Sequence, residues 1–274
     1  RPTAEMLDGL DALLIDLQDV GTRVYTYIWS MLHCLEACAE HGVRVVVLDR
    51  PNPLGGEVVE GPVLDSEYRS FVGLEPIPMR HGLTIGELAR HFVATKQLDV
   101  QLDVVPMRGW RRSMMWPDTD RTWVPPSPNL PRFEGAVLYP GMVLFEGTMV
   151  SEGRGTTTPF EVLGADYMGS YSWHDGAGFG PLDPDSGVTI RPIRFEPTFQ
   201  KFAGRSCGGA FLHVRDPRAV RSYELAVRLL ARIRSTFGEQ FAWRQPPYEY
   251  ETEKLPIDIL AGGPQLRLAV EAYA

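Results

Sequence analysis

The 274-residue sequence lacks most features that mark a specialised class of protein. Its three cysteines are too few for a disulfide framework and do not supply the four ligands of a structural zinc site. No apolar run reaches the roughly 18 residues of a membrane-spanning helix. Lys and Arg total 27 against 35 acidic residues, and the net charge of -8 disfavours a nucleic-acid surface. We therefore expect no metal, no membrane span and no nucleic-acid partner.

Two nucleotide-binding signatures are also missing. No Gly-x-Gly-x-x-Gly run follows the first apolar segment, which disfavours a dinucleotide-dependent enzyme. The glycine-rich segment around Arg154 lacks the Gly-Lys-Ser/Thr ending of a phosphate-binding loop. Functional hypotheses must therefore come from the polar clusters.

The first half of the chain alternates between strand and helix patterns, which is typical of an α/β fold. Apolar runs predict strands at residues 11–17, 43–48, 77–79 and 100–105. Helical spacing predicts a helix over residues 27–41 that ends at Gly42. A capping box formed by Thr84 and Glu87 opens another helix. This order predicts a Rossmann-like open parallel sheet.

The second half of the chain differs in composition and in the order of its predicted strands and helices. Prolines crowd the stretch from Trp110 to Pro131, so we place a boundary there and expect domains at residues 1–125 and 126–274. The second domain is expected to be a smaller α+β unit. Its predicted strands are residues 188–195 and 210–214, and a helix is predicted from Asp216-Pro217 to about Gly238. A further helix is predicted to begin at Thr158, with Glu161 as a capping residue.

A polar cluster follows the first predicted strand. Its members are Asp16, Gln18, Asp19, Arg23, Tyr25 and Tyr27. Asp16 and Asp19 form either a catalytic carboxylate pair or a structural set, in which Asp19 caps a turn and Asp16 binds loop amides. Arg23 pairs either with a substrate carboxylate or with one of these two aspartates.

A second polar cluster follows the next strand. Two prolines stiffen the loop that carries Asp49, Arg50 and Asn52, which suits either ligand recognition or a structural turn locked by Asp49. His81 follows a third strand and either exchanges protons or acts as a structural donor. Ligands of open α/β sheets bind at the carboxyl ends of the strands. We therefore expect these loops to share one crevice.

The segment 151–156 is the third polar cluster. It contains Glu152, Arg154 and Thr156, and glycines flank Arg154. These glycines are interpreted as allowing close backbone approach to a ligand, beside an anion-binding helix N-terminus. Glu36 is a weaker catalytic candidate, because it lies roughly 13 Å along its helix from the first cluster at about 1.5 Å per residue.

Together these motifs resemble one family, the NamZ-type exo-β-N-acetylmuramidases of glycoside hydrolase family 171. The matching segments run in order along the first 164 residues, and a looser match follows at 256–262. They are DLQDVGTR at 16–23, YTY at 25–27, LDRPNP at 48–53, EGPV at 60–63, SFVG at 70–73, HGLTIGE at 81–87, PSPNLP at 126–131, and EGT at 146–148 through SEGRGT at 151–156.

The resemblance implies a glycosidase that releases N-acetylmuramic acid from the non-reducing end of peptidoglycan fragments, without a cofactor. It implies a Rossmann-like domain, a smaller C-terminal domain and a substrate cleft between them. The catalytic carboxylate is expected among Asp16, Asp19 and Glu152. Glu36 is a less favoured candidate because of its distance from the first cluster. Residues expected to bind the saccharide are Gln18, Arg23, Tyr25, Tyr27, Asp49, Arg50, Asn52, His81, Asn129, Arg154 and Thr156.

Three further expectations accompany the resemblance. Family members carry the first strands and a Pro-Glu-His-Gly motif upstream of the segment that Arg1 begins, and the Glu of that motif is expected to be a principal catalytic carboxylate. The isolated chain is accordingly expected to be a poorly soluble, inactive fragment. A role in cell-wall turnover predicts an extracytoplasmic, secreted or periplasmic location. The alternative function is a non-catalytic module that binds cell-wall saccharides.

Overall fold

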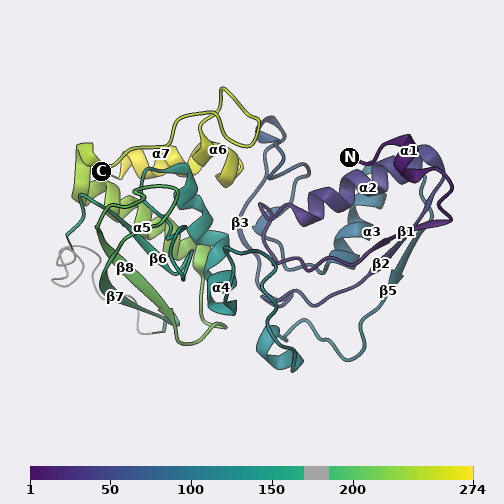
Figure 1. Cartoon of the computed structure of the whole chain (residues 1–274), viewed down its shortest axis with the longest axis horizontal. Helices are drawn as coiled ribbons and strands as arrows, with labels where there is room; N and C mark the ends of the chain where they lie inside the picture. The colour runs from purple at the N-terminus through teal and green to yellow at the C-terminus, as the bar shows by residue number, and fades with distance from the viewer. Residues whose placement is uncertain (170–184, 274) are drawn as a thin grey trace. The chain divides into compact units, whose positions relative to one another are not determined.

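The computed structural model describes residues 1–169 and 185–273, and it divides into two compact units (Figure 1). Unit 1 contains Arg1–Val59 and Arg80–Thr122, and unit 2 contains Glu60–Met79 and Trp123–Ala274. Residues Glu60–Met79 therefore belong with unit 2, although they lie inside the range expected for the first domain.

Unit 1 is built on a three-stranded parallel sheet with the order β1-β2-β5. The strands are β1 (Ala12–Ile15), β2 (Arg44–Leu48) and β5 (Leu102–Val105). Leu13 pairs with Val45, and Val47 pairs with Val104. All three strands run in the same direction, so their carboxyl ends lie at one edge. The predicted parallel sheet is confirmed.

The helices of unit 1 are α1 (Ala4–Leu7), α2 (Tyr27–His41) and α3 (Ile85–Lys96). Helix α2 has the predicted bounds, and Gly42 ends it with a φ of 66° that favours glycine. Helix α3 begins with both hydrogen bonds of the predicted Thr84–Glu87 capping box. The two helices pack against each other and against β2, and they bury Trp29 and Phe92 in contact, 5.5 Å between ring centroids.

Unit 2 contains an antiparallel sheet with the order β6-β8-β7. Its elements are β3 (Glu60–Val63), β4 (Pro78–Arg80), α4 (Phe133–Met142), β6 (Val162–Ala165), β7 (Val188–Phe195), β8 (Cys207–Val214), α5 (Ser222–Phe237), α6 (Pro256–Ala261) and α7 (Gln265–Ala272). Helices α4 and α5 cross so closely that a Cβ on Gly141 would lie 1.8 Å from the Ser222 carbonyl oxygen. The expected α+β character of this half is confirmed.

Two predicted helix starts are wrong. The segment after Thr158 turns instead of forming a helix, because Phe160 adopts a φ of 65° and its N–H binds the Glu152 carbonyl. Strand β6 then begins at Val162, and Glu161 is a buried side chain rather than a capping residue. Helix α5 begins at Ser222, since Asp216 closes a separate turn through the Arg218 N–H.

The described part of the chain contains no helix that is both long and apolar enough to cross a membrane. Nor do its His, Cys, Asp and Glu side chains form any group of three that could hold a metal ion.

Candidate functional site

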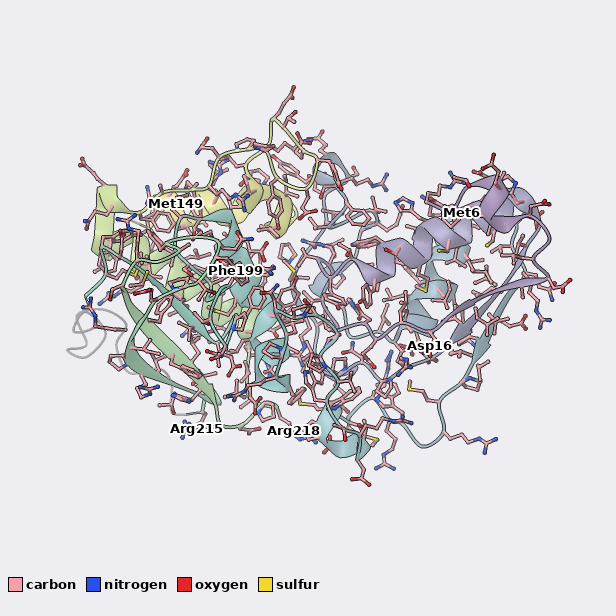
Figure 2. All side chains as sticks on the ribbon, in the orientation of Figure 1. Met6, Asp16, Met149, Phe199, Arg215 and Arg218 are labelled. Carbon is pink, nitrogen blue, oxygen red and sulfur yellow. The ribbon has the colours of Figure 1, made fainter. Side chains whose placement is uncertain are left out.

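Asp16 and Arg50 form an ion pair at the carboxyl edge of the parallel sheet. Asp16 directly follows β1 (Figure 2). Arg50 comes two residues after the neighbouring strand β2. Arg50 Nε donates to Asp16 Oδ1 over 2.5 Å. This hydrogen bond holds the pKa of Asp16 below its usual value. The side chain of Asp16 is 47% exposed, so the site offers an accessible, ionised carboxylate.

Asp19 and His81 form a second pair, which is buried. Asp19 Oδ2 accepts the Gly21 N–H at 2.7 Å and lies 3.2 Å from His81 Nε2. His81 Nδ1 accepts the Leu83 N–H, so the ring carries its proton on Nε2, toward Asp19. The His81 side chain is 0% exposed. Both ring nitrogens thus face other residues of the chain, although neither His81 Nε2 nor Asp19 Oδ1 has a hydrogen-bond partner among the described residues.

Three other polar side chains of these loops bind backbone groups. Gln18 Nε2 donates to the carbonyls of Asp19 and Pro51, which ties the two strand-end loops together. Asn52 bridges the Leu54 N–H and the Leu83 carbonyl.

Asp49 accepts the Gly86 N–H and the Thr84 hydroxyl, which fixes the start of α3. Together with the side chains of Gln18 and Asn52, it forms the rigid frame on which Asp16 and Arg50 are presented.

The remaining candidates of unit 1 lie around α2. Arg23 is fully buried, and its carbonyl accepts the Trp29 indole N–H. The rings of Tyr25 and Tyr27 contact each other at 4.8 Å between centroids.

Glu36 pairs with His33 on α2 and with Lys96 on α3, so its charge is used to join two helices. The structure assigns Glu36 to this helix–helix contact rather than to the strand-end loops.

In unit 2, Glu152 is the centre of a buried charge cluster. Its Oε2 binds Lys201 Nζ at 2.8 Å, and its Oε1 lies 3.5 Å from Arg154 Nε. Lys201 also donates to the carbonyls of Phe145 and Val150. Glu152 is 2% exposed, and two cations balance its charge.

Arg154 connects this cluster to Glu146. Two of its nitrogens bind Glu146 Oε1, at 3.1 and 2.6 Å, while Tyr248 donates its hydroxyl to Glu146 Oε2 at 2.9 Å. Burial lowers the pKa of Arg154, but the charge and hydrogen bond of Glu146, together with the neighbouring Tyr139 and Glu152, outweigh burial and the pKa is raised. Burial and the same carboxylate raise the pKa of Tyr248.

Sequence reasoning missed Glu146, Lys201 and Tyr248 as site residues. Glu146 lies in the EGT motif at 146–148, and that motif was the only sequence feature that pointed to it. Lys201 and Tyr248 had none, because they reach the cluster from distant parts of the chain.

The glycines beside Arg154 serve the protein's own packing. Gly155 has a φ of 85°, and a Cβ there would lie 2.5 Å from the Phe199 carbonyl oxygen. Thr156 donates its hydroxyl to the Gly153 carbonyl at 2.6 Å. The segment leads into a turn and strand β6, so the predicted anion site at a helix N-terminus is wrong.

Two further features of unit 2 bear on the site. Asn129 lies in the turn before α4, where its N–H binds Ser127 Oγ. Glu161 is 1% exposed and lies 3.3 Å from Arg132 Nη2, and burial raises its pKa to about 7.

The turn between Tyr248 and Glu251 has an unusual backbone. Reciprocal hydrogen bonds join these two residues. Glu249 and Tyr250 between them have φ values of 47° and 69°, and Tyr250 is 93% exposed. Such backbone is costly for residues other than glycine. Burial, followed by the charge of Glu146, raises the pKa of Glu249.

The fold consists of a Rossmann-like unit and an α+β unit. Each unit contains carboxylates that form ion pairs with basic side chains, Asp16 with Arg50 in unit 1 and Glu146 with Arg154 in unit 2. The family model of exo-β-N-acetylmuramidase NamZ matches it, the N-terminal part at residues 1–134 and the C-terminal part at 137–274. The chain belongs to this NamZ family.

A curated relative and two solved structures agree with this assignment. The peptidoglycan β-N-acetylmuramidase NamZ of Bacillus subtilis (strain 168) is 43% identical over 271 residues, 99% of this chain and 63% of that protein. This chain therefore spans less than two thirds of that relative. A DUF1343 family protein from Bacteroides fragilis NCTC 9343 is 31% identical, with a TM-score of 0.85 over 98% of this chain and 69% of its own. A second from that organism is 30% identical, with a TM-score of 0.75 over 99% and 70%.

Proposed function

We propose that the protein is an exo-β-N-acetylmuramidase, a glycosidase that releases N-acetylmuramic acid from the non-reducing ends of peptidoglycan fragments. The observation that carries the proposal is the match of both NamZ family models along nearly the whole chain, together with 43% identity to the Bacillus subtilis muramidase. The proposal includes a role in cell-wall recycling at an extracytoplasmic site.

Glycosidases of this general kind work with two carboxyl groups, one of which must be ionised. Asp16 has the properties of that ionised group, because Arg50 keeps its pKa low and its side chain is accessible. Asp19 and Glu152 are almost completely buried, Glu152 binds Lys201, and Asp19 accepts the Gly21 N–H beside His81. We therefore assign chemistry to Asp16 and a positioning role to the other two.

The cluster around Glu146 is the part of unit 2 that we propose for sugar binding. Arg154 and Tyr248 both bind Glu146, so their role in this proposal is to orient that carboxylate. Glu249 is the carboxyl in the turn after Tyr248 that we propose as a proton donor, since partial burial and the Glu146 charge raise its pKa while the residue stays accessible to solvent.

The test is the release of sugar from a chromogenic N-acetylmuramic acid glycoside, with the matching N-acetylglucosamine glycoside as the control. Release from the first alone supports the proposal. Saturable binding of muropeptides without any release would instead indicate a saccharide-binding module. Preference for the N-acetylglucosamine glycoside would contradict the assigned specificity.

A further inference from the structure

Unit 1 contains a cavity of about 280 Å³ that shares only the loop after β2 with the clusters above. Asp49 and Pro51, from the loop after β2, form one wall. Arg108, Trp110 and Arg121, from the long segment after β5, form another. The cavity thus lies where ligands of open α/β sheets bind, outside the carboxyl ends of the strands.

One polar group of this cavity is a buried donor without an acceptor. Trp110 Nε1 is buried and has no hydrogen-bond partner among the residues that the structure describes. An indole nitrogen can only donate, so this group is open to an acceptor that the described residues do not supply. Leaving such a donor buried and unpaired is costly, and a bound acceptor would remove that cost.

The charge of the cavity is positive. Within the described part of the chain, neither Arg108 nor Arg121 has an ion pair. Asp49 contributes one negative charge and accepts hydrogen bonds from the Arg50 and Gly86 N–H groups and the Thr84 hydroxyl, so the two guanidinium groups leave the cavity with one net positive charge. The two guanidinium groups without ion pairs give this cavity a positive charge, although the protein as a whole has a net charge of -8.

We propose that this cavity binds an oxyanion, a carboxylate or a phosphate, between Arg108, Arg121 and the Trp110 indole N–H. A guanidinium offers paired donors that match the oxygens of either group. The volume lies just below the range of about 300–1,000 Å³ typical of sites for larger ligands, so one acidic substituent or a small free anion fits. The anion chemistry stands independently of the proposed glycosidase activity.

The test measures binding by titration calorimetry in a buffer free of phosphate and carboxylate. The probes are inorganic phosphate, N-acetylmuramic acid and N-acetylglucosamine, of which the last two differ by a single acidic substituent. If N-acetylmuramic acid binds and N-acetylglucosamine does not, the anion is a sugar acid. Binding of phosphate would identify a site for free anions. Either result supports the proposal, and affinity must fall as salt concentration rises.

Variants connect the binding to the cavity. Arg108→Gln and Arg121→Gln should each weaken binding by about tenfold or more, as expected for the loss of a hydrogen bond to a charged group. Trp110→Phe keeps the ring but removes the donor, and it should weaken binding several-fold. Arg111→Gln is the matched control, because Arg111 is an exposed neighbour outside the cavity.

Two results would overturn the proposal. One is that the wild-type protein binds neither phosphate nor N-acetylmuramic acid. The other is that the double variant Arg108→Gln with Arg121→Gln binds as tightly as Arg111→Gln. If phosphate binds while no glycoside is hydrolysed, the glycosidase assignment fails and the oxyanion cavity stands.

Discussion

The Arg50 guanidinium contacts the Asp16 carboxylate at 2.5 Å and so joins two neighbouring parallel strands at their carboxyl ends. The contact places an ionised, half-exposed carboxylate where open α/β sheets bind ligands. The side chains of Gln18, Asp49 and Asn52 fix the loops that carry it. The first two predictions concern this pair.

Asp16→Asn should lower kcat/KM by about 10²–10⁴-fold, the range for loss of a group that transfers a proton in catalysis. Folding should be unaffected, because exposed ion pairs contribute about 0–1 kcal/mol. Steady-state kinetics and thermal unfolding check both points. Asp103→Asn is the control, since Asp103 forms a similar exposed pair with Arg44 on the same sheet. Equal activity of the two variants would remove Asp16 from the mechanism.

Arg50→Gln should move the acidic limb of the kcat/KM profile to higher pH. Arg50 favours the ionised form of Asp16, so removing the guanidinium lets the pKa of Asp16 rise toward its ordinary value. The pH dependence of kcat/KM for wild type and variant measures this shift. Arg44→Gln should leave the limb in place, because its partner is Asp103. An unmoved limb in Arg50→Gln would mean that another group controls it.

Local patterns predicted much of unit 1, because its signals lie close together in the sequence. The apolar spacing of α2 and the glycine at position 42 defined that helix at both ends. The Thr84–Glu87 capping box was equally local. The Thr158–Glu161 pattern failed because the same residue types fit a turn, and the left-handed backbone of Phe160 decides between the two.

The charge cluster of unit 2 depends on contacts between distant parts of the chain. Glu146 and Tyr248 are 102 positions apart, and Glu152 and Lys201 are 49 apart. No periodicity or motif joins such positions, so their partnership follows only from the packing of the unit. For the same reason, sequence analysis could not decide whether Asp49 and His81 bind ligands or loops.

Glu161→Gln should reduce the fall in stability between about pH 4.5 and pH 7. The folded-state pKa of Glu161 is raised to about 7, so the native state holds a proton that the unfolded state releases. Stability from this group is full below the unfolded pKa and is lost as pH rises through the folded one, a change of about 1–3 kcal/mol.

Denaturant unfolding at several pH values measures how steeply the free energy of unfolding of Glu161→Gln changes with pH. Glu134→Gln provides the comparison: Glu134 contacts the same Arg132 and its charge makes the smallest contribution to the raised pKa of Glu161, so this variant should keep most of the wild-type slope. If the free energy of unfolding of Glu161→Gln falls with pH as steeply as that of the wild type, the Glu161 carboxyl does not titrate between about pH 4.5 and pH 7.

Lys201→Met should destabilise the protein by about 3–5 kcal/mol, the usual cost of leaving one charge of a buried pair without its partner. Glu152 would keep only Arg154, at 3.5 Å. Adding Glu152→Gln should recover part of the loss, because the remaining group is then neutral. Urea unfolding of the single and double variants measures the recovery. If the double variant is as unstable as Lys201→Met, the loss arises from the carbonyl contacts of Lys201 instead.

Tyr250→Gly should raise the free energy of unfolding by about 1 kcal/mol, because glycine adopts the left-handed backbone at this position without steric cost. Thr252→Gly, two residues on and outside the left-handed region, should lower it through the added freedom of the unfolded chain. Chemical denaturation compares the two.

Backbone strain of this kind is typical of functional sites, so we expect Tyr250→Gly to reduce kcat/KM for the muramic acid glycoside even as it stabilises the fold. A variant that is more stable and fully active would show that the exposed Tyr250 ring does not contact the substrate. A variant that is less stable would show instead that the turn packs in a way that its backbone geometry does not explain.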